Sequence, residues 1–348
     1  MERTVDATAT PTRAERFDAY QRRHRWLGFP IAVFYKFVDD QGVYLAALIT
    51  YYGFLSLFPL LLLLASTVGF LLQNSPNWRD RILNSALDQF PIIRDVLEDP
   101  QGLQGGTAAV VVGALIAVYG ALGVAQATQN AMNAAWAVPR NRRPNPIRVR
   151  LRSVLLILTA GITVFSTTVL SAVVSSSQAY GSELSSGIRT AAIVAAVLLN
   201  TAIAVVAFRV ATARPLRKRD VLPGAITAAL WWQALQLFGT AYVENVFQGA
   251  STTYGVFSLV FGLLASLLLA SLGLVMCVEL NVVLAKGLYP RALLTVFTDD
   301  VDLTEADKQA YADLAQAQRL KGFEQVTVSY DDDGQYKSAR RNTPRDIF

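Results

Sequence analysis

The chain has 348 residues, of which 53% are hydrophobic and 16% are charged, whereas soluble domains average about 25% charged residues. Charged residues are frequent at the two ends and sparse in several long stretches between them, which excludes an ordinary soluble protein and predicts a polytopic membrane protein. The single cysteine, Cys277, excludes an intramolecular disulfide, and no group of His, Cys, Asp and Glu has metal-ligand spacing, so we expect no metal and no cofactor.

Residues 1–41 form a basic segment at the start of the chain. It lacks the long apolar core of a secretory signal, so we expect no cleavable signal peptide. Within it, residues 26–41 are apolar but too short to span a membrane, and they begin with Trp26. This pattern predicts an interfacial helix that leads into the first membrane span.

A helix needs about 20 mostly apolar residues to cross about 30 Å of hydrocarbon. Six segments between residues 42 and 290 meet this requirement, so the sequence predicts an all-α fold with a transmembrane domain of six helices. The predicted spans are about 45–72, 107–128, 153–175, 188–209, 222–246 and 255–285.

The number of basic residues alternates between high and low from one connection to the next. Six arginines lie in 129–152 and five basic residues in 209–221, whereas the connection between the third and fourth spans has only Arg189 and the fifth connection has none. Basic loops stay in the cytoplasm, so both termini are predicted to be cytoplasmic. The basic loops are separate patches at a membrane face, which favours anionic lipid headgroups as partners and argues against nucleic acid.

The stretch 51–64 reads YYGFLSLFPLLLLL. Tyr51 and Tyr52 suit the membrane interface, and Pro59 removes one backbone hydrogen bond and bends the helix. Tyr52 and Ser56 share a face, and Ser56 is a candidate partner for the carbonyl that the proline frees. One interpretation is an interfacial aromatic pair with a packing kink, and the other is a kink that opens a polar vestibule.

Polar side chains recur along the predicted spans. The second span carries a stripe of amides at its cytoplasmic end, the fifth span carries a stripe in its outer half, and further polar groups lie in the fourth and sixth spans. These residues are Gln126, Gln129, Asn130, Asn133, Asn200, Gln233, Gln236, Thr240, Glu244, Glu279 and Asn281. Such groups avoid lipid, so they either line a pathway or hydrogen-bond the helices to one another.

Glu279 is an acid at a depth where it needs a partner. We expect that partner to be an arginine of 140–152 or Arg209. An ion pair that joins the sixth span to a cytoplasmic loop is the structural interpretation, and a proton- or ligand-sensing carboxylate is the functional one.

The C-terminal part, 291–348, is an acidic cytoplasmic tail. Residues 304–320 open with a Thr-x-x-Asp signal that resembles a capping box and predict one helix. The residues that follow are expected to be disordered. Protein partners bound through this tail are a further expectation.

Several segments together resemble the YihY/BrkB family of bacterial inner-membrane proteins over about residues 25–290, and the tail resembles actinobacterial members. The most specific residues of the resemblance are Tyr51, Tyr52, Phe58, Pro59, Tyr254, Gly255, Glu279 and Asn281. They lie in ALITYYGFLSLFPLLLLLASTVGFLL (47–72), YGVFSLVFGLL (254–264) and VELNVVL (278–284). Two further segments, YGALGVAQATQNAMNAAWAVPRNR (119–142) and LPGA (222–225), also resemble the family.

The resemblance implies six spans with both ends inside and a plasma-membrane location. The family carries the name virulence factor, which comes from a role in serum resistance. It also carries an old ribonuclease label that is regarded as a misassignment. The sequence departs from relatives in the sixth span, where Ser266 and Leu268 stand in place of aromatic residues.

Two functions remain open. The first is a transporter or lipid-handling translocator in envelope biogenesis, with the bilayer and its anionic headgroups as partners. The second is a scaffold that does not transport and that recruits envelope or cytoplasmic proteins, with a homo-oligomer as a further expectation. An enzyme is not expected, because the one histidine, His24, lies outside the membrane domain and leaves a Ser-His-Asp arrangement without a base.

Overall fold

The computed structural model describes residues 13–71, 107–177, 182–242, 252–296 and 301–330, and every regular element in these ranges is helical. The chain divides into two compact units. The terminal unit comprises 1–32, 139–142 and 287–348, and the bundle unit comprises 33–138 and 143–286. Each is described by itself.

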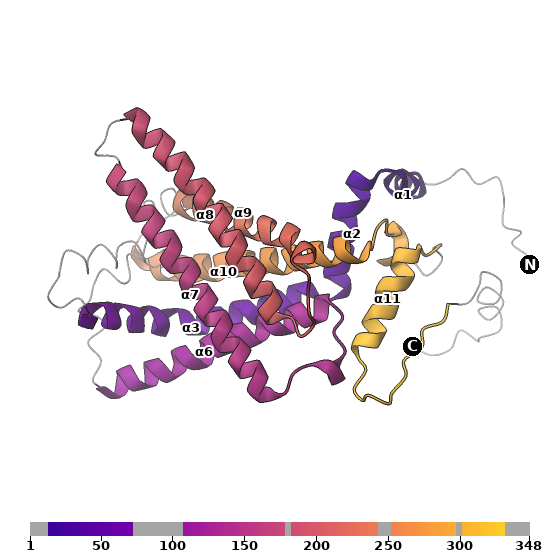
Figure 1. Cartoon of the computed structure of the whole chain (residues 1–348), viewed down its shortest axis with the longest axis horizontal. Coiled ribbons are helices and arrows are strands. Elements are labelled where there is room, and N and C mark those ends of the chain that lie inside the picture. Colours follow the sequence, from indigo (N-terminus) through magenta and orange to yellow (C-terminus); the bar gives the residue numbers. More distant parts are fainter. Residues whose placement is uncertain (1–12, 72–106, 178–181, 243–251, 297–300, 331–348) are drawn as a thin grey trace, which may run out of the picture. The chain divides into compact units, whose positions relative to one another are not determined.

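Among the described residues, the bundle unit contains six long helices, one at each predicted span (Figure 1). They are α3 (Gly42–Leu71), α6 (Thr107–Ala135), α7 (Pro146–Ser177), α8 (Ser182–Ala211), α9 (Lys218–Tyr242) and α10 (Thr252–Lys286). Within the described ranges, three of them hold stretches long and apolar enough to cross a membrane: Pro146–Ser166, Thr190–Ala211 and Val260–Lys286. The chain therefore has the character of a membrane protein.

Several helix boundaries differ from their predicted positions, and those of α6 and α7 have local reasons. α6 continues to Ala135, because its amides extend the helix beyond the apolar stretch that ends near 128. α7 starts at Pro146 rather than near 153, and proline suits the first turn of a helix. At the other end of the bundle sequence, α10 stops at Lys286 because Gly287 has a φ of +67°, a left-handed conformation that favours glycine.

Small residues on α6 allow α3 to pack closely against it, and Figure 1 shows the two helices side by side. A Cβ added at Gly120 would lie 2.6 Å from the Cβ of Ser56, and one at Gly123 would overlap the ring of Tyr52. Gly113 has no such neighbour within 4 Å. Close approach of α3 and α6 therefore depends on two glycines. α6 also contacts α7, and α7 packs against α8, α8 against α9, and both α9 and α3 against α10.

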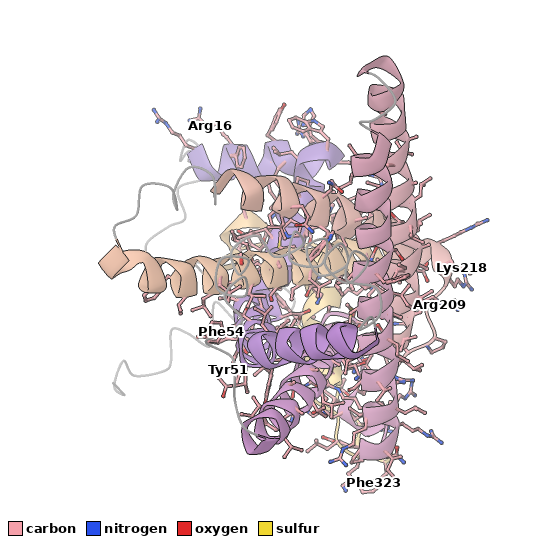
Figure 2. All side chains as sticks on the ribbon, turned by 90° about the vertical axis from the view of Figure 1, so that its left-hand side faces the viewer. Arg16, Tyr51, Phe54, Arg209, Lys218 and Phe323 are labelled. Carbon is pink, nitrogen blue, oxygen red and sulfur yellow. The ribbon has the colours of Figure 1, made fainter. Side chains whose placement is uncertain are left out.

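Hydrogen bonds show which helix ends lie together. Asn133, near the end of α6, accepts from the backbone N–H of Ala213 at 2.8 Å, and Arg152, in the second turn of α7, donates to the carbonyl of Thr212 at 3.3 Å. Arg209 and Lys218 project from the same region, where α8 ends and α9 begins (Figure 2). We call this part of the bundle unit the basic end.

The terminal unit joins the two ends of the chain. Its elements are α1 (Arg13–Arg23), the first part of α2 (Arg25–Asp39), the 3-10 turns η2 (Arg140–Arg142) and η5 (Leu293–Val296), and α11 (Glu305–Ala317). Gln21 of α1 donates to the carbonyl of Arg291 at 2.6 Å, and Asp18 accepts from the N–H of Leu293 at 3.0 Å. The N–H of Asn141 donates to the carbonyl of Arg319 at 3.1 Å, so the connection between α6 and α7 belongs to this unit too.

The tail differs in part from its prediction. Thr304 caps α11 with the predicted capping box, but the helix ends at Ala317 rather than near 320. The structure describes the chain on to Tyr330, whose hydroxyl donates to the carbonyl of Lys308 at 2.9 Å, so Tyr330 contacts the tail helix. α2 forms a helix over the residues predicted to be interfacial, whereas α1 has no counterpart among the predicted elements.

Candidate functional site

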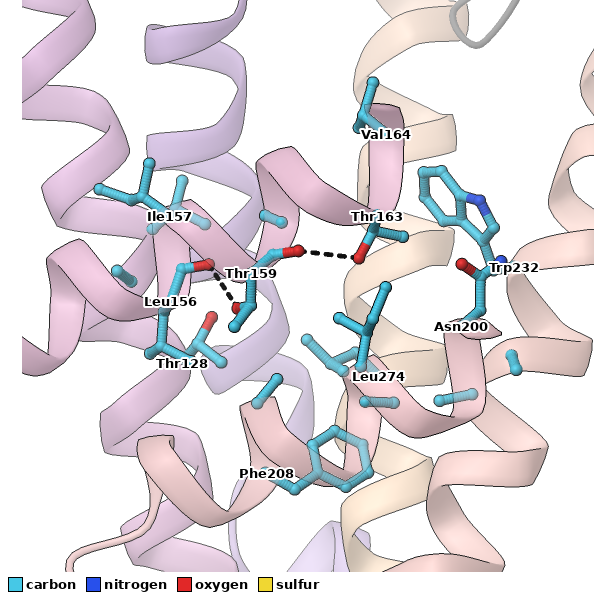
Figure 3. A pocket seen from close by; sticks show the side chains of 18 of the residues that line it. Thr128, Leu156, Ile157, Thr159, Thr163, Val164, Asn200, Phe208, Trp232 and Leu274 are labelled. Atoms are coloured by element: carbon cyan, nitrogen blue, oxygen red, sulfur yellow. Dashed lines mark hydrogen bonds between the residues drawn. The ribbon is translucent and has the colours of Figure 1, made fainter. Parts of the chain in front are cut away.

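A cavity of about 360 Å³ lies within the bundle unit (Figure 3). α6, α7 and α8 form most of its lining, and α9 and α10 add a few side chains. The lining is dominated by alanine and branched aliphatic residues, and it contains no charged residue. A cavity of this size and polarity suits an apolar ligand.

Only a few polar groups face this cavity, and Asn200 of α8 is the notable one. Its side chain is buried, and its carbonyl oxygen has no hydrogen-bond partner among the parts of the chain that the structure describes. Thr159 donates to the carbonyl of Leu156 at 2.7 Å, so its hydroxyl proton is held by its own helix. Figure 3 shows Asn200 and Trp232 pointing into the cavity from α8 and α9. A buried acceptor without a donor marks a place where a ligand group or water would bind.

A second cavity of about 260 Å³ adjoins the first, with which it shares Val124, Ala228, Trp232 and Leu274. It lies between α3, α6, α9 and α10. Thr50 donates to Ser271 at 3.1 Å across this space, which ties α3 to α10. The two cavities together form an apolar interior of the bundle unit. Residues of α6, α7, α8, α9 and α10 line the first cavity, and α3 lines only the second.

The structure assigns different roles to the amides predicted on α6. Gln129 donates to Ser153 at 2.9 Å and to the carbonyl of Val149, and Asn133 accepts from Ala213, so both hold neighbouring segments together. Gln126 is half-buried and Asn130 is exposed, and neither lines either cavity. For Gln129 and Asn133, the interpretation as helix-bonding groups fits better than a pathway.

The amides predicted on α9 do not line either cavity. Gln233 and Gln236 are half-buried, and the cavity walls take Trp231, Trp232 and Leu235 from the same helix instead. The side chain of Thr240 is not described, and Glu244 lies outside the described residues. Two adjacent tryptophans in mid-span are the sequence signal that would have found this wall.

Tyr52 and Ser56 lie at the contact between α3 and α6. The ring of Tyr52 meets Tyr119 edge-on at 6.1 Å, and Tyr51 meets Tyr52 in the same manner at 5.2 Å. Ser56 donates to the carbonyl of Gly53 at 3.1 Å, not to the carbonyl of Leu55 that a proline at 59 leaves free. Neither residue lines either cavity, and the side chains of the other motif residues, Phe58, Pro59, Tyr254 and Gly255, are not described.

The partner of Glu279 is not an arginine, so that prediction was wrong. Lys36, near the end of α2, places its ammonium 3.6 Å from a carboxylate oxygen of Glu279 and also donates to Asp40. Lys36 also donates to the carbonyl of Ala135 at 3.3 Å, which brings α2, the end of α6 and the end of α10 together. Asn281, two residues further along α10, accepts from the N–H of Gly224 at 2.6 Å and so fixes α9 to α10. Sequence reasoning missed Lys36 because it sought the partner in the basic connections after the second and fourth spans, whereas Lys36 precedes the first span.

Comparison with known proteins gave one result. No curated protein and no solved structure matched the chain. The family model described as virulence factor BrkB matches residues 33–293, a range that begins at the first residue of the bundle unit and ends with the first residue of η5. This match covers well over half of the sequence and confirms the resemblance carried by the motifs of α3 and α10. The chain belongs to the virulence factor BrkB family of membrane proteins.

Proposed function

We propose that this protein is a lipid-handling translocator of the bacterial plasma membrane, and the observation that carries the proposal is the pair of adjoining apolar cavities inside the bundle unit. Their linings contain no charged side chain, so a charged or strongly polar solute would lose its hydration without compensation. A hydrocarbon chain has no such cost. Asn200, buried and without a donor among the described residues, supplies one acceptor for a polar group near the chain.

The same proposal includes six spans, α3 and α6 to α10, with both termini in the cytoplasm. The hydrogen bonds of Gln21 and Asp18 to 291–293 favour this topology, because they require the segments before α3 and after α10 to lie on one side of the membrane. An even number of crossings follows. The bond from Asn141 to Arg319 favours the same side for the connection between α6 and α7.

Anionic lipid headgroups fit the basic end as partners. Basic residues near a membrane surface attract anionic lipids by about 1 kcal/mol each. Exposed basic residues gather there at the start of α7 and between α8 and α9, namely Arg148, Arg150, Arg209, Arg214, Arg217, Lys218 and Arg219. The proposal assigns the chain no catalytic step and no cofactor.

The test is reconstitution of the purified protein into liposomes, followed by measurement of fluorescent phospholipid scrambling. Ala204→Phe places a ring in the larger cavity and should abolish scrambling, whereas Ala202→Phe, two residues away on an exposed part of α8, should leave it unchanged. Asn200→Leu should slow scrambling without loss of folding. Absence of scrambling by the unaltered protein, or full activity of Ala204→Phe, would contradict the proposal.

A scaffold function is the second candidate, and one feature of the terminal unit favours it. Phe323 is 89% exposed and Leu320 is 57% exposed, just beyond the end of α11. Exposed apolar side chains of this kind are typical of protein-binding surfaces. If the protein is a scaffold, deletion of 297–348 should abolish its role in the cell, and Ala204→Phe should not.

A further inference from the structure

The bundle unit contains a buried cluster of one lysine and two acids. Lys36 donates to Asp40 and lies 3.6 Å from Glu279, and the carboxyls of Asp40 and Glu279 face one another. The side chains of Lys36 and Asp40 are each 3% exposed, and that of Glu279 is fully buried. This lysine–carboxylate cluster is thus closed off from water.

The charges of the cluster do not balance when all three groups are ionised, because two carboxylates face one ammonium. The neighbouring helices supply no compensating cation: α3 and α6 contain no charged residue, and α10 contains only Glu279 and, two turns later, Lys286. The charged residues of α9 lie in its first turn, before Gly224 meets Asn281. On α2, the next charged residue after Lys36 is Asp39, which is a further acid and not a compensating cation.

Hydrogen bonding leaves Glu279 unsatisfied as a carboxylate. Neither of its oxygens accepts a hydrogen bond from any donor that the structure describes, although the side chain is completely buried. A buried ionised carboxylate normally accepts several hydrogen bonds, because burial without them is costly. A protonated carboxyl removes this difficulty, since it is neutral and can donate to the carboxylate that faces it.

We propose that Asp40 and Glu279 share one bound proton beside the ammonium of Lys36, so that this cluster is a proton-binding site of the bundle unit. Binding converts one carboxylate to a carboxylic acid and brings the net charge of the cluster from one negative charge to zero. Two carboxyls held together in a dry environment favour this arrangement, because the charge of one carboxylate and the loss of water both raise the pKa of the other. Burial also raises the pKa of Asp40, against the lowering by the Lys36 ammonium.

The site lies where α2, α6 and α10 meet, so its charge affects how these three helices hold together. Lys36 reaches the carbonyl of Ala135 from the same position. Loss of the proton would leave two repelling carboxylates around one lysine. The inference stands apart from lipid movement, because it concerns only the protonation of the cluster.

Infrared spectroscopy of the purified protein in lipid tests the proposal directly, because a protonated carboxyl has a C=O stretch separate from that of a carboxylate. At neutral pH the unaltered protein should show this band, with its shift in D2O, and Glu279→Gln or Asp40→Asn should remove it. Glu279→Gln imitates the protonated acid and is expected to fold, so it decides the result even where Asp40→Asn does not fold.

Glu305→Gln is the matched control, since the side chain of Glu305 is 92% exposed on α11 and should contribute no such band. The proposal is overturned if the unaltered protein has no protonated-carboxyl band at neutral pH. It is equally overturned if the band persists in Glu279→Gln with undiminished intensity and also in Asp40→Asn.

Discussion

Two buried acids, one in each unit, differ in the number of hydrogen bonds that their carboxylates accept. Asp307 of the terminal unit receives a hydrogen bond from Arg291 and further ones from the N–H of Ala292, the N–H of Thr304 and the hydroxyl of Thr304. Glu279 of the bundle unit is equally buried, yet none of the described groups donates a hydrogen bond to it. Burial alone therefore does not define what a buried acid does.

The number of donors separates a structural acid from one that can take up a proton. Asp307 closes the N-terminus of α11 and holds the chain at Arg291 beside it, so both carboxylate oxygens serve the fold. An ionised carboxylate in such a setting is stabilised by its hydrogen bonds. Among the groups that the structure describes, Glu279 pairs only with the ammonium of Lys36, which also donates to Asp40. Four experiments break or sharpen this contrast.

The largest effect is expected for Asp307→Ala. The change leaves the buried guanidinium of Arg291 without its carboxylate, and removal of one partner from a buried ion pair costs about 3–5 kcal/mol. Hydrogen exchange of residues 301–330 should accelerate accordingly. Glu305→Ala on the same helix is the control, because its exposed pair with Lys308 is worth about 0–1 kcal/mol.

The isosteric pair Asp307→Asn and Glu279→Gln tests the contrast itself. Asp307→Asn should reduce stability by about 1.5–3 kcal/mol, because hydrogen bonds to a charged group are lost. Glu279→Gln should cost less than about 1 kcal/mol, because no hydrogen bond to the carboxylate is broken. Thermal unfolding in detergent measures the second variant, and hydrogen exchange of the tail measures the first. Equal losses would remove the distinction between the two acids.

Gly224→Ala tests the close contact between α9 and α10 beside Glu279 in the bundle unit. A Cβ at this position would overlap the carbonyl of Cys277 and the amide of Asn281, next to Glu279 on α10. Crowding of this kind costs about 1–3 kcal/mol. Thermal unfolding should show the loss, whereas Gly113→Ala, which meets nothing within 4 Å, should be neutral or stabilising. An unaffected Gly224→Ala would mean that α9 and α10 are not held at this contact.

The smallest effect concerns Glu324 of the terminal unit. Hydrogen bonds from the N–H groups of Leu320 and Lys321 lower the pKa of Glu324 below its ordinary value. The folded turn therefore favours the ionised form of Glu324. The stabilisation of the turn by this carboxylate is complete above about pH 4.3, the ordinary pKa of an unfolded glutamate. It is lost as the pH falls through the lower pKa of the folded state. NMR titration of the Leu320 amide should follow this loss, and Glu324→Gln should remove it.

Two features of the fold follow from short stretches of sequence. Six apolar segments of sufficient length predicted six long helices, and each is present in the bundle unit. The Thr-x-x-Asp signal at Thr304 predicted the start of α11, and the capping box is formed. Both signals are local, because apolar length and capping depend on residues within a few turns of one another.

The partners of the polar residues depend on tertiary structure. Asn200 and Gln233 look alike in sequence, as amides within apolar helices, but only Asn200 lines a cavity. Glu279 pairs with Lys36, which precedes the first span, rather than with an arginine of 140–152 or Arg209. These choices depend on the rotation of each helix about its axis and on the close approach that Gly120 and Gly123 allow.

The sequence by itself therefore determined the class of protein, the family, the positions of its helices and the residues able to carry polar chemistry. The tertiary structure decided which of those residues bond helices together, which face the apolar cavities, and which acid remains without donors. The physical reason is that apolar length sets where a helix forms, whereas side-chain pairing is set by packing between helices far apart in the chain.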